Sequence, residues 1–448
     1  MVKQCVIIGS GPAGNAAALA ASAAGLTSIL MVERDSFGGT CTNRGCIPTK
    51  FFLSRSENIA SGGDEAVARE WTRVLAHKNA LVQGLSRSLE GTCRGKGIEI
   101  VRGTATFLSP NEIAVVDSTG GRSVYAGERF IIATGSRPAQ IPRSPSDGMS
   151  IITSDDALDL KELPRSLAII GSGAVGAEFA FIFTRLGVKV TLVEAAQRLF
   201  PAEDSAVDAV FRKIYERMGV TLLVGDPVME IDVRPGGDGV VVKLASGAVI
   251  EVTKCLIGIG RTLETRGLGC EKAGIHLDQR GGIAVDSDLS TSQPHIRAAG
   301  DVTGRMLLAH AASFMGEFAG RAAAGQPYSP VPYHSIPWAT FTRPEVAGVG
   351  LNVEKAAQAG IDCLSATVPL MDNVKARIDR TTEGFVKIVA EQTSGKLVGC
   401  TIVGPHASDM IHAVALAIHQ RMTARELKGF SFIHPSISES IGDLIRTM

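Results

Sequence analysis

Two cysteines near the N-terminus have the type and spacing that disulfide chemistry requires. Cys41 and Cys46 lie in the segment GGTCTNRGCIPTK, which ends at Lys50. Two thiols at this spacing can close a small ring and reopen it by thiolate exchange. The thiolate is the nucleophile in that exchange, and a nearby cation such as Lys50, or a helix N-terminus, stabilises it. The pair therefore favours redox chemistry at sulfur.

Two other interpretations of this pair are ordinary buried thiols and half of a zinc site. Zinc needs further ligands, and the sequence offers no second close cysteine pair and no Cys/His cluster, so we expect no metal site. The eight cysteines are otherwise scattered, unlike the disulfide framework of a small secreted domain. We expect a protein of a reducing compartment, in the cytoplasm.

The elements that must position these thiols follow from a motif that occurs twice. An apolar strand at residues 6–8 runs into GSGPAG, a small-residue helix and a second strand that ends at Glu33. The same order recurs from residues 167–170 through GSGAVG to a strand that ends at Glu194. In each copy the acid lies about twenty residues past the glycines, where it would hold a ribose hydroxyl. The motif glycines are Gly9, Gly11 and Gly14, then Gly171, Gly173 and Gly176.

The motif has the same physical basis in both copies. The first glycine permits a tight turn, the second lets the backbone approach a pyrophosphate, and the third lets helix and strand pack closely. Amide groups and the helix dipole then hold the phosphate charge. The alternative is a βαβ unit whose glycines only make turns. Two complete units, each with its acid in place, favour two bound dinucleotides.

Composition agrees with an α/β protein and excludes some partners. The 448 residues suffice for several domains, and 45% of them are hydrophobic. Because 45 basic residues balance 45 acidic ones, neither nucleic acid nor an anionic membrane surface is an expected partner. The alanine-rich stretch at residues 13–26 is too short for a membrane span, and we expect it to form a buried helix.

Further strand-like runs divide the rest of the chain. Residues 130–136, 255–260 and 296–301 have the pattern of apolar strands that end in turns, and Arg137–Pro145 has the composition of a linker. Beyond residue 331, strand-like runs alternate with helices, one of them at residues 408–420. We predict an α/β fold with a dinucleotide-binding domain at 1–148, completed by 262–330, a second at 149–261, and a C-terminal α+β domain at 331–448.

The order of these motifs resembles a known family. The cysteine segment, the two glycine motifs and the runs ATG, GIGR and AAGD follow the order seen in class I pyridine nucleotide-disulfide oxidoreductases. The chain is most similar to their dihydrolipoamide dehydrogenase branch. The resemblance implies Rossmann-like domains for FAD and NAD and a C-terminal dimerisation domain. It also implies that Cys46 is the thiolate beside the flavin and that Cys41 exchanges with substrate.

The resemblance assigns the other site residues as well. Glu178 stands where the family has an acid that pairs with the lysine corresponding to Lys50, although a plain helix-surface charge is the alternative. Besides the motif glycines, the FAD site would use Glu33, Lys50, Thr134, Gly135, Asp301 and Ala309, and the NAD site would use Glu194 and Gly260.

Glu194 favours NAD over its phosphorylated form. A carboxylate at the end of this strand accepts hydrogen bonds from the ribose 2′-hydroxyl and repels a 2′-phosphate. Arg198 is a mild hint in the opposite direction, and we interpret it as a solvated surface charge. NADPH-dependent glutathione and trypanothione reductases are therefore disfavoured.

The C-terminal segment SFIHPSISE contains a second pair of interest, His434 and Glu439. Local sequence leaves two interpretations open, because Ser436 and Glu439 also have the spacing of a helix capping box after Pro435. The segment resembles the family's His-Pro and Glu pair, in which the histidine is the acid/base for the substrate thiol and the glutamate orients it. In that family the histidine reaches the disulfide of the other subunit, which implies a homodimer.

Presence and absence of cysteines narrow the expected activity. High-molecular-weight thioredoxin reductases and mercuric reductases have an extra cysteine pair at the C-terminus, whereas no cysteine follows Cys400 in this chain. Soluble transhydrogenases of this fold lack the redox pair, whereas this chain has both Cys41 and Cys46. We expect oxidation of dihydrolipoamide by NAD, with a small disulfide or dithiol, or the lipoyl domain of a 2-oxoacid dehydrogenase complex, as partner. Phe432 and Ile433 stand where lipoamide enzymes of this family commonly have His-Ala. NADH-dependent reduction of another small disulfide is therefore an alternative, and a redox-inert flavoprotein subunit is a weaker one.

Overall fold

The computed structural model describes residues 2–59 and 63–448. The chain divides into two compact units, each containing a parallel sheet. The first comprises Met1–Phe51, Thr72–Ala139 and Arg261–Val331; the second comprises Phe52–Trp71, Gln140–Gly260 and Pro332–Met448. Two Rossmann-like sheets and a C-terminal α+β region confirm the predicted fold class. The finer three-domain boundaries stay a prediction.

The parallel sheet of the first unit has the order β18-β7-β1-β2-β3. Its central strands are buried along their whole length, because helices and loops cover both faces. Apolar runs of Val, Ile, Leu and Met therefore replace the alternation of a half-exposed strand. The strands are β1 Cys5–Ile8, β2 Ile29–Glu33, β3 Glu99–Arg102, β7 Phe130–Ile132 and β18 Ile296–Ala298.

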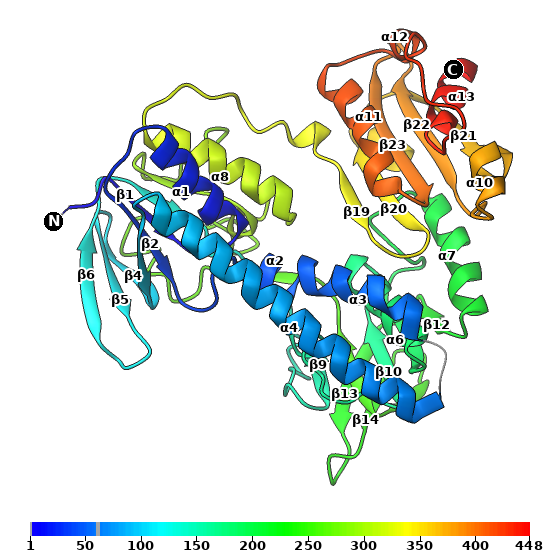
Figure 1. Cartoon of the computed structure of the whole chain (residues 1–448), viewed down its shortest axis with the longest axis horizontal. Coiled ribbons are helices and arrows are strands. Elements are labelled where there is room, and N and C mark those ends of the chain that lie inside the picture. Colours follow the sequence, from blue (N-terminus) through cyan, green and yellow to red (C-terminus); the bar gives the residue numbers. More distant parts are fainter. Residues whose placement is uncertain (1, 60–62) are drawn as a thin grey trace. The chain divides into compact units, whose positions relative to one another are not determined.

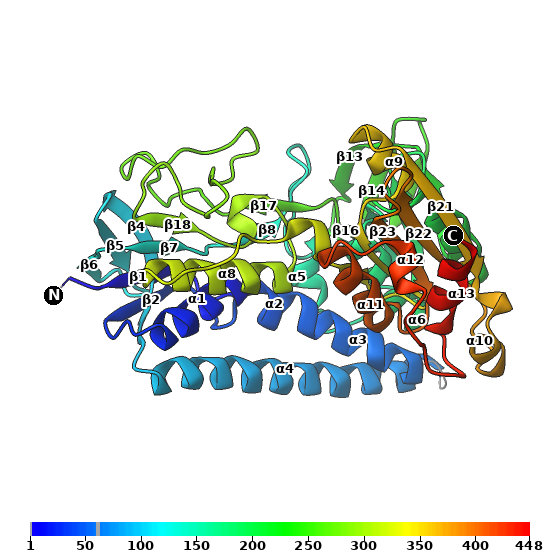
Figure 2. The same ribbon diagram turned by 90° about the horizontal axis from the view of Figure 1, so that it is seen from above.

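Helices α1 (Pro12–Ala23) and α8 (Ala309–Ala323) lie side by side in this unit (Figures 1 and 2). Glycines on α8 bring the two backbones close: a Cβ on Gly316 would lie 2.0 Å from the carbonyl oxygen of Ala13. A Cβ on Gly320 would lie 2.3 Å from the carbonyl oxygen of Ala17. The prediction of a buried alanine-rich helix is confirmed, and its small side chains are what permit this packing.

The stretch predicted as a linker begins as a strand. Residues Ser136–Pro138 form β8, which pairs antiparallel with β17, Arg261–Leu263, so its backbone is held by ladder hydrogen bonds. The other elements assigned wholly or partly to this unit are α2 Gly39–Arg44, α3 Cys46–Ile59, α4 Gly63–Gly95, the antiparallel sheet β4 Thr104–Ser109, β5 Glu112–Val116 and β6 Arg122–Ala126, and a 3-10 helix at Asp301–Thr303.

The second unit repeats the parallel arrangement, with the order β12-β11-β10-β16-β9. As in the first unit, the strand before the glycine turn is central and pairs with the strand that ends in glutamate. Its elements are β9 Ile151–Thr153, α5 Ser154–Ala157, β10 Ser166–Ile170, α6 Ala174–Arg185, β11 Lys189–Glu194, α7 Ser205–Arg217, β12 Thr221–Val224 and β16 Lys254–Ile257, with a small sheet of β13 Val228–Val233, β14 Val240–Leu244 and β15 Val249–Val252.

The C-terminal part of the second unit is an antiparallel sheet of order β19-β20-β23-β22-β21 with helices packed against it. Among the described residues, no helix is long and apolar enough to cross a membrane. The elements are β19 Trp338–Thr340, β20 Glu345–Gly350, α9 Val353–Gln358, β21 Cys363–Pro369, α10 Val374–Ile378, β22 Phe385–Glu391, β23 Leu397–Gly404, α11 Ala407–His419, α12 Ala424–Leu427 and α13 Glu439–Thr447, with 3-10 helices at Tyr333–Ser335 and Leu370–Asp372.

Candidate active site

The two candidate redox thiols lie on consecutive helices. Cys41 is in α2, and Cys46 is the first residue of α3, where backbone amides and the helix dipole favour negative charge. Gly45 separates the helices, and a Cβ there would lie 2.9 Å from the carbonyl oxygen of Thr40. Both sulfurs belong to half-buried residues and are free thiols. The fold thus brings the two predicted thiols together and leaves them accessible.

The segment that carries the thiols is fixed to the first glycine turn. The Gly38 amide donates to both the carbonyl and the hydroxyl oxygen of Ser10, at 3.2 Å each. The Asn43 side chain donates to the carbonyl oxygens of Phe37 and Gly39 at 2.9 Å. These bonds hold the start of α2 and so position Cys41 beside the predicted FAD site.

Cys46 affects the ionisation of Cys41. The hydrogen bond with Cys46, together with burial, raises the pKa of the Cys41 thiol above its ordinary value, while Lys50 acts in the opposite direction. Cys41 therefore keeps its proton at neutral pH unless a base removes it. Elsewhere, burial raises the pKa of Cys5 and of Cys255 to about 12, so these thiols are not nucleophiles at neutral pH.

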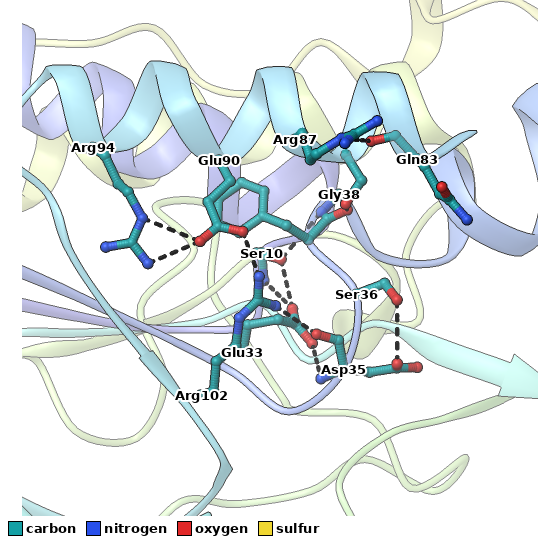
Figure 3. A network of polar contacts seen from close by, with 12 residues as sticks. Ser10, Glu33, Asp35, Ser36, Gly38, Gln83, Arg87, Glu90, Arg94 and Arg102 are labelled. Carbon is teal, nitrogen blue, oxygen red and sulfur yellow. Dashed lines mark hydrogen bonds and ion pairs between the residues drawn. The ribbon is translucent and has the colours of Figure 1, made fainter. Parts of the chain in front are cut away.

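The acid at the end of β2 is held by the glycine turn (Figure 3). Glu33 is buried, and its Oε2 accepts hydrogen bonds from the amide and hydroxyl of Ser10 at 2.8 and 2.6 Å. Its Oε1 accepts one from the amide of Asp35 at 2.8 Å. Asp35 also pairs with Arg44, which lies between the two cysteines, and its carbonyl accepts from Arg102. Glu33 is therefore oriented before any ribose reaches it.

The second copy repeats this arrangement. Glu194 Oε2 accepts hydrogen bonds from the amide and hydroxyl of Ser172, both at 2.8 Å, and Oε1 accepts one from the amide of Ala196 at 2.8 Å. Sequence analysis did not single out Ser10 or Ser172, although the same serine at the second position of both turns was a signal for them.

The glycines test whether these turns fit a dinucleotide. A Cβ on Gly14 or Gly176 would lie 1.8 Å from the carbonyl oxygen of the first glycine of its turn, so neither position admits a side chain. The middle glycines are different. Counting only the residues that the structure describes, Gly173 has no neighbouring atom within 4 Å of the position of a Cβ, and Gly11 has only Gly39 Cα, at 3.9 Å. The open space lies where a pyrophosphate approaches the helix N-terminus, so both turns fit the group.

Asp301 receives support that the sequence did not reveal. The Ser136 hydroxyl donates to Asp301 Oδ2 at 2.5 Å and accepts from Arg261 Nε at 2.6 Å. Thr134 donates its hydroxyl to the carbonyl oxygen of Glu264 at 2.7 Å. Of the other predicted cofactor contacts, Ala309 is the first residue of α8, and Gly135 and Gly260 have positive φ with open space at the Cβ position.

His434 and Glu439 are in direct contact. His434 Nδ1 lies 2.9 Å from Glu439 Oε1, while Oε2 accepts the amide of Ser436 at 2.9 Å. The bond from Ser436 and, to a smaller extent, the bond with His434 lower the pKa of the Glu439 carboxyl. The contact between His434 and Glu439 is thus present, whereas the predicted capping box is incomplete. Glu439 accepts the Ser436 amide, but the Ser436 hydroxyl has no hydrogen-bond partner among the described residues, and α13 begins at Glu439 after Ser438. The catalytic role of the pair stays a prediction. His434 itself is 72% exposed.

Glu178 is not a helix-surface charge. It lies on α6 with 4% of its surface exposed, and its Oε1 accepts the amide of Phe341 at 2.9 Å. Lys50 lies on α3 and belongs to the first unit, whereas Glu178 belongs to the second. Pairing of the two side chains stays a prediction.

Comparison with known proteins assigns the family. Residues 3–316 match the sequence model of the family described as pyridine nucleotide-disulphide oxidoreductase, and residues 336–445 match the dimerisation domain of the same family. The chain belongs to this family. It is accordingly an oxidoreductase that uses FAD and NAD, and its C-terminal domain is a dimerisation domain.

Several relatives extend over nearly the whole chain. A dihydrolipoyl dehydrogenase of Chlamydia muridarum is 35% identical over 97% of this chain and 94% of the relative. One of Bacillus subtilis is 34% identical over 98% and 97%. Among solved structures, LpdA of Mycobacterium tuberculosis has a TM-score of 0.90 with 29% identity, over 100% of this chain and 99% of its own. The HOCl-induced flavoprotein disulfide reductase RclA of Escherichia coli has a TM-score of 0.88 with 29% identity, over 99% of both chains.

Proposed function

We propose that the protein catalyses the oxidation of dihydrolipoamide to lipoamide by NAD, through a disulfide formed between Cys41 and Cys46. The observation that carries the proposal is the thiol pair on α2 and α3, fixed by Ser10 to a turn that fits a dinucleotide. Full-length similarity to dihydrolipoyl dehydrogenases of two bacteria supports the substrate.

Thiol–disulfide exchange transfers two electrons from the substrate dithiol to the cysteine pair. One substrate thiolate attacks Cys41 Sγ of the disulfide, forms a mixed disulfide and releases Cys46 as a thiolate. The second substrate thiol then attacks the mixed disulfide and releases Cys41, so the dithiol is oxidised as the cysteine pair is reduced. NAD is the two-electron oxidant of the overall reaction, and bound FAD supplies the electron-transfer chemistry between the thiols and the nicotinamide.

Proton transfer is the task proposed for His434. Each substrate thiol must lose a proton before it attacks, and imidazole has the appropriate pKa range for a base near neutral pH. In the reverse direction Cys41 needs a base, because Cys46 and burial raise the pKa of its thiol. We place this base on the partner subunit of a homodimer, and Glu439 would hold the ring through Nδ1.

The lipoyl domain of a 2-oxoacid dehydrogenase complex is the proposed macromolecular source of the dithiol. A lipoyl group on a long flexible lysine could reach the thiols without a large interface, so the free amide is a suitable assay substrate.

The test is a steady-state assay of the FAD-loaded protein with dihydrolipoamide and NAD, and with NADP in parallel. We expect NAD-dependent turnover that Cys41→Ser abolishes and His434→Ala lowers by about 100-fold or more, as for loss of a general base. Absence of turnover in a protein whose flavin NADH reduces would contradict the proposed substrate.

A second candidate is NADH-dependent reduction of another small disulfide. The observation that favours it is the residue before the candidate base: Ile433 is 81% exposed and stands where lipoamide enzymes commonly have alanine. RclA, a flavoprotein disulfide reductase, is also among the structural relatives. Comparison of NADH oxidation rates with lipoamide and with other low-molecular-weight disulfides separates the two candidates.

A further inference from the structure

The loop after β11 contains a cation whose position matters for nucleotide choice. Between Glu194 and Asp204 the sequence is AAQRLFPAE, in which Arg198 is the single basic residue. In Rossmann-like domains, an arginine beside the acid that ends this strand can accommodate a 2′-phosphate. Arg198 is therefore the one group in this loop that could offset repulsion between Glu194 and NADP.

The loop folds back onto the nucleotide site. The amide of Phe200 donates to the hydroxyl oxygen of Ser172 at 3.2 Å, and that hydroxyl donates to Glu194 Oε2 at 2.8 Å. The backbone of Arg198 lies between Glu194 and this contact in the chain. The Arg198 side chain therefore projects from the segment next to the Glu194 carboxylate, which is expected to bind the ribose.

The guanidinium of Arg198 is bound by a residue that is distant in the sequence. Its two terminal nitrogens donate to both carboxylate oxygens of Glu354, on α9, at 2.8 and 2.6 Å. One nitrogen also contacts the carbonyl oxygens of Pro201 and Glu203, at 3.3 and 3.4 Å. A bidentate ion pair of this kind fixes both the orientation of the guanidinium and the position of its charge. Arg198 is therefore a partly exposed surface charge, as the sequence indicated, but its guanidinium is held in a fixed ion pair.

We propose that Glu354 is a specificity-determining residue of the nucleotide site. By holding Arg198, it withholds the guanidinium that a 2′-phosphate could recruit, and it so reinforces the preference for NAD that Glu194 establishes. The inference deepens, and rests on, the NAD dependence within the proposed function. It assigns nucleotide selection to a residue of the C-terminal domain, 156 positions away from Arg198 in the sequence.

The loop has other anchors, so the pair can be broken without releasing the loop. Lys355 Nζ donates to the carbonyl oxygen of Ala202 at 2.7 Å, and Trp338 Nε1 lies 3.0 and 2.9 Å from the two carboxylate oxygens of Glu203. The buried Asp204 pairs with Lys387 at 2.8 Å. Substitution of Glu354 should therefore remove the only carboxylate bonded to Arg198 among the described residues and leave the two long contacts with the carbonyl oxygens of Pro201 and Glu203, while the backbone of Arg198 keeps its place.

The test measures binding directly, without turnover. The FAD-loaded full-length protein is titrated calorimetrically with 2′,5′-ADP and with 5′-AMP, which differ in the 2′-phosphate. We expect Glu354→Ala to tighten binding of 2′,5′-ADP by about three- to tenfold, the range for a partly exposed charge pair, and to leave 5′-AMP within about twofold. Glu354→Gln, which keeps one acceptor for Arg198, should give a smaller gain in the same direction.

Two further variants identify the source of the gain. Arg198→Met in the Glu354→Ala background should abolish it. Glu383→Ala is the matched control, because Glu383 also binds an arginine, Arg217, through two contacts, and Arg217 lies at the end of α7 rather than in this loop. It should leave both affinities unchanged.

The proposal is overturned if Glu354→Ala leaves the affinity for 2′,5′-ADP unchanged while thermal unfolding shows a folded protein. It is also overturned if the gain persists without Arg198. Failure of lipoamide turnover would overturn the proposed substrate and would leave these binding results interpretable.

Discussion

Glu439 divides its carboxylate between a side chain and the backbone, with His434 Nδ1 on one oxygen and the Ser436 amide on the other. Glu439→Gln keeps an oxygen for Ser436 but turns an NH₂ group toward Nδ1. The ring would then be held with its proton on Nε2, so that nitrogen could not act as a base. We expect kcat/KM to fall by about 100-fold or more, by analogy with tautomer reversal in catalytic triads.

The stability of this variant distinguishes orientation of His434 from the hydrogen bond that Glu439 accepts from the Ser436 amide. Because the bond to Ser436 is retained, the free energy of unfolding of Glu439→Gln, measured by urea denaturation, should stay near that of the wild type. Glu439→Ala should lower it by about 1 kcal/mol, as for loss of one hydrogen bond. Equal activity of Glu439→Gln and the wild type would contradict an orienting role.

At the thiols, the expected effect is on pH dependence. The hydrogen bond with Cys46 is the largest cause of the raised pKa of Cys41, followed by burial. Cys46→Ser removes the neighbouring sulfur and its negative charge, so the pKa of Cys41 should fall and its thiolate should form at lower pH. The rate of alkylation of Cys41 by iodoacetamide, followed by peptide mass spectrometry against pH, measures this. An unchanged midpoint would contradict the coupling.

At the scale of elements, the second glycine turn offers two substitutions with opposite consequences. Gly173 has φ −67° and open space at its Cβ position, so Gly173→Ala should fold normally. Its methyl group would occupy the pyrophosphate position, and we expect affinity for NADH to fall roughly tenfold, which corresponds to about one lost hydrogen bond.

Gly176→Ala should instead destabilise the fold. Its Cβ would lie 1.8 Å from the carbonyl oxygen of Gly171, so helix α6 and the turn must separate. We expect a loss of about 3 kcal/mol in the free energy of unfolding, at the upper end for overpacking. Calorimetric titration with NADH and urea unfolding of both variants check the pair. A destabilised Gly173→Ala protein would contradict the open space inferred at the Cβ position of Gly173.

At the scale of the whole molecule, the dimerisation domain permits a test of how sites are assembled. His434 is 72% exposed in the single chain, and Phe430 and Ile433 beside it are also exposed. If the partner subunit's His434 completes each site, a heterodimer of Cys41→Ser and His434→Ala chains has one site with both defects and one with neither.

Mixing the two inactive variants under conditions of subunit exchange should therefore restore activity, to about a quarter of the wild-type value for random pairing in a twofold dimer. Activity of the mixture, measured against each variant alone, checks this. No recovery, despite heterodimers demonstrated by native mass spectrometry, would place Cys41 and His434 of one chain in the same site.

Local sequence determined the parts of this protein that depend on short-range geometry. Both glycine turns and the strands that end at Glu33 and Glu194 were predictable, because sterics and chain direction within a βαβ unit fix them. The thiol segment directly follows the first of these units in the sequence. The repeated GSG even contained the serines that hold both acids, although their role became evident only from Ser10 and Ser172 in the structure.

Tertiary structure decided the contacts whose partners are far apart in sequence. Three hydrogen-bonded pairs join separate elements: Glu178 with the Phe341 amide, Asp301 with Ser136, and Arg198 with Glu354. No local pattern predicts such a partner, because its position depends on how whole sheets and helices pack. For Arg198 the consequence is chemical: the sequence presents a free cation beside a nucleotide site, whereas the fold pairs it with a carboxylate.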